Sequence, residues 1–107
     1  MSLPHPETWL YPRPEGLFCE PGGFFIDPLR AVDRAVITHG HSDHARGGHR
    51  AVLAHPATLA IMKARGVAGT TSQAAGWGER VRLGEVTLRL EPAGHVLGSA
   101  QVVMEHR

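Results

Sequence analysis

The sequence has little that would tie it to a secreted or membrane setting. Its 107 residues include one cysteine, Cys19, so no disulfide can form within the chain, which agrees with a reducing cytosol. No apolar run approaches the length of a membrane span. The first residues lack the basic and then apolar pattern of a signal peptide. We therefore expect a cytoplasmic chain without membrane contact.

An excess of charge of one sign is also missing. The chain has 11 Lys and Arg against 10 Asp and Glu, a formal net charge of +1. A protein that acts on nucleic acid need not be basic overall, but the composition does not reveal a phosphate-binding patch. The length is enough for one small domain with a modest core.

Histidine, by contrast, is plentiful, with 8 in the chain. Three imidazoles and one carboxylate fall between residues 39 and 44: His39, His41, Asp43 and His44. All four are good ligands for a borderline metal such as zinc. Residues 34–38 are predicted to form a β-branched strand, so this cluster lies where a strand ends in a loop. A polar loop with coincidental histidines is the alternative, and such a dense set of ligand-type residues disfavours it.

The spacing of the cluster indicates how metals could be shared. In an extended loop His39 and His41 project to the same side, because side chains alternate with period two. Asp43 continues that side and His44 points elsewhere. One ion could take the two histidines and a second could take Asp43 and His44, which would allow a two-metal site with ions about 3.5–4 Å apart.

Residues 38–44 resemble the His-x-His-x-Asp-His motif of the metallo-β-lactamase superfamily. Residues 92–100, Pro-Ala-Gly-His-Val-Leu-Gly-Ser-Ala, resemble the next histidine motif in its nucleic-acid-processing branch. Within that branch the resemblance is closest to the ligase-associated DNA exonucleases, and the β-CASP nucleases of RNA 3′-end processing are near relatives. Residues 16–19 and 23–28 also fit the first group, and the similarity extends from about Trp9 to Glu105.

The resemblance implies an α+β fold, namely the N-terminal half of an αββα sandwich with mostly antiparallel or mixed β-sheet and one clear helix. We expect residues 1–15 to form an irregular arm and residues 16–107 a partial domain whose C-terminal half is missing. The family places a bridging aspartate and a last metal-binding histidine later in the chain. After His95 this sequence has His106 and no Asp, so we expect it to be an N-terminal part.

The resemblance also implies the roles of single residues. His39, His41 and His95 would hold one metal ion, and Asp43 and His44 would begin the second site. Asp43 would in addition contact the attacking water, which makes it the expected catalytic residue. The ions would be two zinc ions in the full-length parent, with manganese possible. Asp27 would orient a ligand histidine; an Asx-turn before Pro28 is an equally weighted alternative.

The expected activity is metal-dependent phosphodiester hydrolysis, as in a DNA 3′-exonuclease associated with DNA ligase and repair. By resemblance, DNA is favoured over RNA, and a DNA ligase or helicase is a possible partner. We expect the 107 residues alone to be inactive. The alternatives are an RNA-processing β-CASP nuclease, a non-catalytic metal-binding or self-associating module, and a hydrolase of small esters or thioesters. The context of residues 94–100 argues against the last.

Local patterns predict the remaining elements. Residues 17–20 and 24–27 are predicted to form a hairpin, as are residues 79–83 and 86–90. A helix is expected over residues 56–65, with Pro56 at its first position and Gly66 after its end. Further strands are expected over residues 50–54 and 99–105, and loops over residues 66–78 and 93–98. We predict no function for His49 or for His55, which we expect to be solvated or to lie beside the start of the helix.

Overall fold

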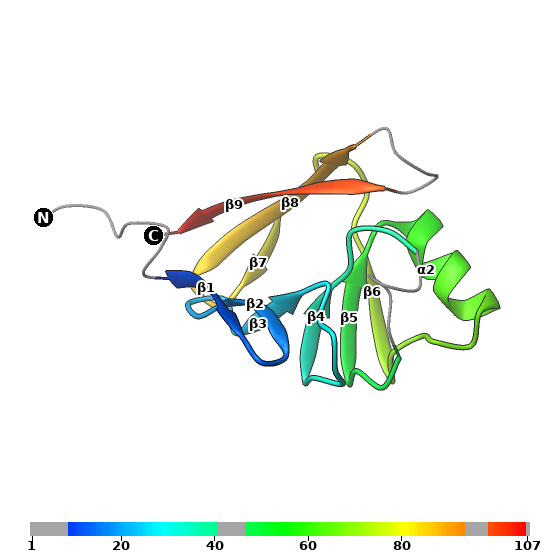
Figure 1. Ribbon diagram of the computed structural model, residues 1–107. Helices are drawn as coiled ribbons and strands as arrows, with labels where there is room; N and C mark the ends of the chain where they lie inside the picture. Colours follow the sequence, from blue (N-terminus) through cyan, green and yellow to red (C-terminus); the bar gives the residue numbers. More distant parts are fainter. Residues whose placement is uncertain (1–8, 41–46, 94–98, 107) are drawn as a thin grey trace, which may run out of the picture.

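The computed structural model describes residues 9–40, 47–93 and 99–106, and every structural statement below refers to these residues. They form a mixed six-stranded sheet, a three-stranded antiparallel sheet and a single α-helix (Figure 1). The expected α+β fold with mixed and antiparallel sheets is confirmed. None of the described helical segments has the length and apolarity needed to cross a membrane.

The six-stranded sheet has its strands in the order of the chain. The first three strands are antiparallel, whereas β3, β4, β5 and β6 run parallel. Helix α2 makes the crossover from β5 to β6, as a parallel pair requires. The elements are β1 (Leu10–Arg13), β2 (Gly16–Cys19), β3 (Phe24–Ile26), β4 (Arg34–Val36), β5 (Ala51–Ala54), α2 (Pro56–Ala64) and β6 (Thr71–Ala74).

The three-stranded sheet is a meander of β7 (Val81–Leu83), β8 (Val86–Pro92) and β9 (Ala100–His106). In β8 buried residues alternate with partly buried ones, as expected for a strand with one face on a core. The turn between β7 and β8 contains Gly84 at φ +59°, a left-handed conformation that favours glycine. This hairpin agrees with the sequence prediction.

Two hydrophobic clusters lie on opposite faces of the six-stranded sheet. Alternation along β4 and just beyond it separates them: Val36 faces the three-stranded sheet, and its neighbours Ala35 and Ile37 face α2. Between the sheets lie Cys19, Phe24, Val36, Leu53, Ala75, Val81, Val86, Leu88, Leu90 and Ala100. Under the helix lie Ala35, Ile37, Val52, Ala54 and Met62. The described residues therefore form three layers, with α2 on one side of the main sheet and the small sheet on the other (Figure 1).

The elements differ from the prediction at two places. Residues 71–74 were predicted to be loop but form β6, and residues 10–13 were predicted to be irregular but form β1. Both are edge strands, and all four residues of β6 are exposed, so neither shows a clear apolar alternation. The division of the chain into an arm over residues 1–15 and a domain over residues 16–107 stays a prediction.

Candidate metal centre

The carboxyl ends of β3, β4, β5 and β6 meet at one edge of the main sheet, because these strands are parallel. Asp27 follows β3, Thr38 and His39 follow β4, His55 follows β5, and Ala75 follows β6. In sheets of this kind, ligands bind in the crevice beyond the carboxyl ends of the strands. This edge is therefore the candidate site.

The backbone that carries His39 is fixed as an extension of β4. The Ile37 amide donates to the Leu53 carbonyl at 3.0 Å, and Ile37 is fully buried. His39 is itself buried, with 8% of its surface exposed. An imidazole held at the end of a paired strand loses little freedom when it binds a ligand, because its backbone is already ordered.

Asp27 holds the residue directly before His39. Its carboxylate accepts hydrogen bonds from the Thr38 amide, at 2.8 Å, and from the Thr38 hydroxyl, at 2.6 Å. The Asp27 amide in turn donates to the Val36 carbonyl at 3.0 Å. The carboxylate thus links the end of β3 to the start of the histidine motif. The further prediction that Asp27 orients a ligand histidine stays a prediction.

Gly40, the residue after His39, packs directly against α2. A Cβ atom at this position would lie 2.6 Å from Cγ2 of Ile61 and 3.0 Å from its Cβ, so a larger residue cannot fit without movement. The Arg65 guanidinium, at the C-terminal end of α2, donates to the Gly40 carbonyl at 2.6 Å. The sequence analysis did not find this contact, since Arg65 lies 25 positions away and belongs to no motif.

Both ends of the segment that contains His95 are next to the same strand end. The Ala93 amide donates to the Ser99 carbonyl at 3.0 Å, which brings together the two residues that flank positions 94–98. The Ala100 amide donates to the Thr38 carbonyl at 2.8 Å. Ser99 and Ala100 are buried. Two stretches that are far apart in sequence therefore converge beside Thr38.

Of the residues predicted to bind metal or act in catalysis, the structure describes His39 and the supporting Asp27. His41, Asp43, His44 and His95 lie outside the described residues. Over residues 9–40, 47–93 and 99–106, no group of three or more His, Cys, Asp and Glu side chains gathers as a metal site would require. The donor set of imidazoles and a carboxylate suits zinc, and its assembly stays a prediction.

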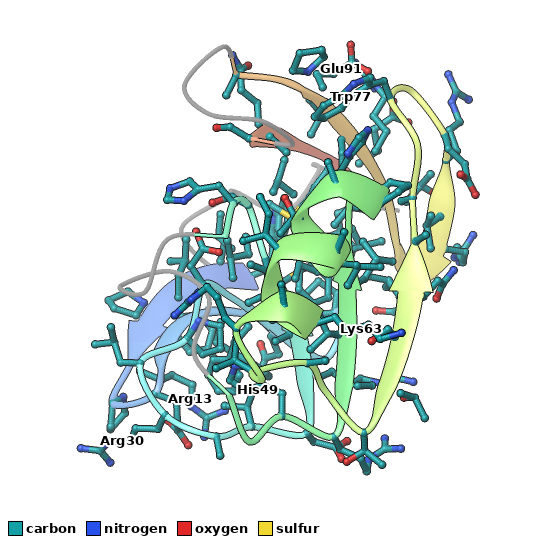
Figure 2. All side chains as sticks on the ribbon, turned by 90° about the vertical axis from the view of Figure 1, so that its right-hand side faces the viewer. Arg13, Arg30, His49, Lys63, Trp77 and Glu91 are labelled. Atoms are coloured by element: carbon teal, nitrogen blue, oxygen red, sulfur yellow. The ribbon has the colours of Figure 1, made fainter. Side chains whose placement is uncertain are left out.

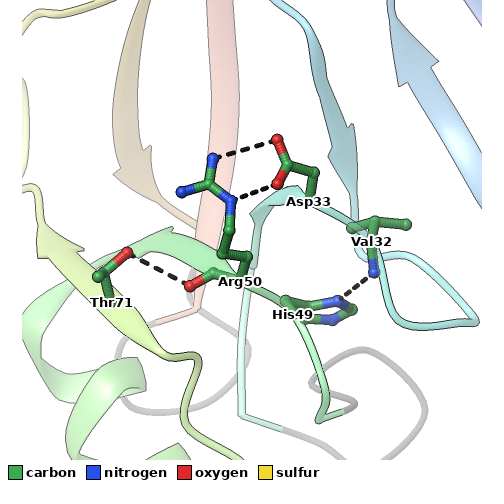
Figure 3. Close-up of polar contacts among 5 residues, drawn as sticks. All are labelled: Val32, Asp33, His49, Arg50 and Thr71. Carbon is green, nitrogen blue, oxygen red and sulfur yellow. Dashed lines mark hydrogen bonds and ion pairs between the residues drawn. The ribbon is translucent and has the colours of Figure 1, made fainter.

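The two histidines for which no function was predicted have structural contacts. The Nδ1 atom of His49, a residue that is 1% exposed, accepts a hydrogen bond from the Val32 amide at 3.1 Å (Figure 3). His55 is the N-cap of α2, and its Nδ1 atom accepts from the Ala57 amide at 3.1 Å. His55 therefore supplies one of the acceptors that the first turn of a helix needs.

Cys19 is buried between the sheets, and this burial raises the pKa of its thiol above the ordinary value of 9.0. A backbone hydrogen bond at Gly22 acts in the opposite direction but does not cancel the effect. Since metals bind the thiolate form, a thiol that is kept protonated is a poor ligand.

Most of the chain is similar in sequence to known proteins. A relative from Opitutus terrae, named probable DNA ligase, is 34% identical over 92 residues. The alignment covers 85% of this chain and 9% of that protein, so the chain spans a small part of the relative's length. The family described as the metallo-beta-lactamase superfamily matches residues 16–106, which include every described strand except β1. The match over most of the chain and the layered α+β fold show that the chain belongs to the metallo-β-lactamase superfamily.

Proposed function

We propose that this chain carries the metal-holding part of a metal-dependent phosphodiesterase that cleaves nucleic acid, as a DNA 3′-exonuclease. Its superfamily consists in general of metal-binding hydrolases, and that coarser description follows from membership. The nuclease assignment goes further. It rests on the motif around His39 and on the sequence context of residues 92–100.

One observation supports it most directly. The hydrogen bond from the Ala100 amide to the Thr38 carbonyl joins the strand after His95 to the strand before His39. The bond between Ala93 and Ser99 closes the intervening segment at its base. Five residues between two joined ends cannot reach far, because an extended chain gains at most about 3.3–3.6 Å per residue. A shared metal ion between His39 and His95 is therefore sterically reasonable.

In this proposal His39, His41 and His95 hold one ion, and Asp43 and His44 begin the site of a second. Zinc suits the imidazole donors, and manganese is the other candidate. When bound, such ions supply Lewis-acid chemistry for phosphodiester hydrolysis. Asp43 positions the attacking water, and the hydrogen bonds of the Ile37 and Thr38 amides hold the backbone that leads to His39.

The relative named probable DNA ligase favours DNA over RNA as the substrate and makes a DNA ligase a plausible functional partner. The match covers only 9% of that protein, so the DNA substrate and the ligase partner are proposed from a small shared segment. No Asp follows His95 in the 107 residues. We therefore expect this chain alone to bind metal through its first site and to hydrolyse little DNA.

The first experiment measures bound zinc in the purified chain and in His41→Ala. We expect the substitution to weaken zinc binding at least tenfold, because loss of a residue that only orients a ligand already costs about 10- to 100-fold in metal affinity. The matched control is His55→Asn, which removes an imidazole outside the proposed set and leaves a good N-cap for α2. Equal zinc content in the chain and in His41→Ala would contradict the metal assignment.

The second experiment assays hydrolysis of 3′-labelled DNA, RNA and a thioester by the longest natural polypeptide that contains these residues. We expect DNA to be shortened from its 3′ end, and we expect chelation or Asp43→Asn to abolish this activity. Thioester turnover without DNA hydrolysis would overturn the nuclease proposal, although the superfamily assignment would stand.

A further inference from the structure

Trp77 forms an aromatic pair at the edge of the sheet where the candidate metal centre lies. Its indole stacks on the His55 imidazole, with ring centroids 3.9 Å apart and an angle of 21° between the planes. Trp77 is 41% exposed, whereas most large apolar side chains of the described residues are buried or half-buried. An indole that is supported on one side and open to solvent is suited to stack on another flat group.

The backbone on both sides of Trp77 is anchored. Two residues earlier, the amide of the buried Ala75 donates to the Ala54 carbonyl at 3.0 Å. One residue later, the Gly78 amide donates to the Leu90 carbonyl at 2.9 Å. These bonds tie the segment to β5 in the main sheet and to β8 in the small sheet. His55 is held in turn by its contact with the Ala57 amide. The stacked pair is therefore preorganised, which lowers the entropy cost of binding.

The pair lies close to Thr38, the first residue of the segment 38–44 that is predicted to bind metal (the metal loop). The pairing between β4 and β5 continues as far as Ile37, and that between β5 and β6 as far as Ala75. The first residues beyond the paired parts of the adjacent strands β4, β5 and β6 are thus Thr38, His55 and Gly76. Neighbouring strands are about 4.8 Å apart, so the outer two lie roughly 10 Å from each other. A nucleotide next to a phosphate at the metal loop would be within reach of Trp77.

We propose that Trp77 and His55 form a stacking platform for an unpaired nucleobase of the substrate. This inference rests on the proposed function. Aromatic side chains bind the bases of single strands by their π-faces, with little dependence on sequence. The platform would therefore select a frayed or single-stranded 3′ end and hold it while the adjoining phosphate lies at the metal loop.

Charge around the pair favours a base over a phosphate. The Glu79 carboxylate accepts from the Gly76 amide at 3.0 Å, beside Trp77. On the other side, a Cβ atom at Gly78 would lie 3.6 Å from the Glu91 carboxylate, whose charge is partly balanced by Arg89, with its Nε atom 3.8 Å away. Figure 2 shows Trp77 and Glu91 at the same end of the molecule, away from His49 and Arg30. Carboxylates repel a phosphate but accept hydrogen bonds from the amino groups of bases.

The test uses tryptophan fluorescence. The chain has two tryptophans, so the variant Trp9→Phe leaves Trp77 as the reporter. This variant is titrated, with a chelator present, with a single-stranded oligonucleotide, with the same strand in a blunt duplex, and with an oligonucleotide of equal length that consists of abasic sites. We expect saturable quenching by the single strand, and weak quenching by the duplex and by the abasic strand.

Substitutions at the platform complete the test, with binding of labelled single-stranded DNA as the readout. We expect Trp77→Ala to weaken binding about 5- to 150-fold, the range found when an aromatic side chain that stacks on a base is removed. Trp77→Phe should retain most of the affinity, which separates stacking from a folding defect. The control is Leu29→Ala, which removes another exposed apolar side chain, one that is 56% exposed.

Two results would overturn the platform: equal quenching by the abasic strand, or unchanged affinity in a folded Trp77→Ala variant. Its failure is distinguishable from failure of the proposed function. If metal-dependent DNA hydrolysis persists in Trp77→Ala with an unchanged preference for frayed ends, the platform is wrong and the nuclease assignment stands. If binding depends on Trp77 but the longest natural polypeptide that contains these residues hydrolyses no DNA with metal, the nuclease assignment is wrong.

Discussion

At the scale of single residues, Asp27 combines an unusual backbone with a defined contact. Its φ angle is +45°, a left-handed conformation that Asp and Asn tolerate better than most residues. Its carboxylate accepts two hydrogen bonds from Thr38, one from the amide and one from the hydroxyl. The resemblance implied that Asp27 orients a ligand histidine, and the described contact is with the backbone and side chain of Thr38, which precedes His39.

A matched pair of substitutions tests the contribution of this carboxylate. Asp27→Gly and Asp27→Asn both tolerate a positive φ, but Gly removes both acceptor oxygens whereas Asn keeps one. Because hydrogen bonds to charged groups contribute about 1.5–3 kcal/mol, we expect Asp27→Gly to lower the free energy of unfolding by about 2 kcal/mol. Asp27→Asn should lose less than half of that. Urea denaturation measures both, and an unchanged free energy of unfolding in Asp27→Gly would show that the carboxylate does not contribute to stability.

Gly40 offers a second test at this scale. Gly40→Ala would place a methyl group 2.6 Å from Cγ2 of Ile61, so we expect a destabilisation of about 1–3 kcal/mol from overpacking. Combination with Ile61→Ala should cost less than the sum of the two single changes, because the clash is relieved. Gly76→Ala is the control, since a Cβ atom there would contact nothing closer than 3.8 Å. Additive thermal-denaturation results for Gly40→Ala and Ile61→Ala would contradict this account.

At the scale of elements, the sequence predicted most of what has a strong local pattern. Helix α2 was expected over residues 56–65 and is found over Pro56–Ala64, because Pro56 and Gly66 mark its ends. Edge strands escaped prediction. In β1 the run is interrupted by Pro12, and β6 has no apolar residue larger than alanine. The pairing of β6 with β5 is imposed by the α2 crossover, a non-local constraint that a local pattern does not reveal.

The connection between β4 and β5 has a testable pH dependence. Figure 3 shows Arg50, which directly precedes β5, bonded through its guanidinium to the Asp33 carboxylate, which directly precedes β4. The hydrogen bond from Arg50, and then its charge, lower the pKa of Asp33 from its ordinary value of 3.8. A depressed folded-state pKa gives stability that is present above the unfolded value and is lost as the pH falls through the folded value.

We therefore expect the stability of the chain to decline below about pH 4 with a small contribution from this pair. Both side chains are exposed, so salt should screen the interaction. Asp33→Asn should flatten the acid limb of the stability curve slightly, and high salt should reduce the difference between the variant and the parent. Thermal melts at several pH values and two salt concentrations measure this, and an unchanged acid limb in Asp33→Asn would refute it.

At the scale of the whole molecule, the layered arrangement could be predicted from the superfamily resemblance, but the contact between the residues that flank the two motifs could not be derived from spacing. It is a backbone contact between Thr38 and Ala100, which are 62 positions apart. A hollow of about 330 Å³ lies on the face of β4, β5 and β6 that points toward the three-stranded sheet. Its lining includes Phe24, Val36, Leu53 and Leu83 from the core between the sheets. Phe24, Val36 and Leu53 are nevertheless buried, so the hollow exposes little of this core.

The edge strand β6 is exposed along its whole length, and an exposed edge strand favours self-association. In β6 the Thr71 amide points toward β5, where it donates to the Arg50 carbonyl, so alternation directs the Ser72 amide outward. We expect the purified chain to associate in a concentration-dependent way, as measured by sedimentation velocity. Ser72→Pro should reduce this by removing an outward amide, with little change in melting temperature.

Gln73→Pro is the matched contrast, because alternation turns that amide toward β5, so the substitution should destabilise the fold. A strictly monomeric chain at all concentrations would contradict the prediction of self-association. Equal association in the chain and in Ser72→Pro would instead show that another surface is responsible.

The strand order of the main sheet has a consequence for synthesis on the ribosome. Every strand from β2 to β6 pairs with the strand made immediately before it, and the last of them ends at Ala74. The nascent polypeptide can therefore add strands one at a time, in the order of translation, without waiting for a distant partner. The closing step is the arrival of β9, whose first residue, Ala100, bonds to Thr38. This contact therefore forms only after the sheet that positions His39 is complete.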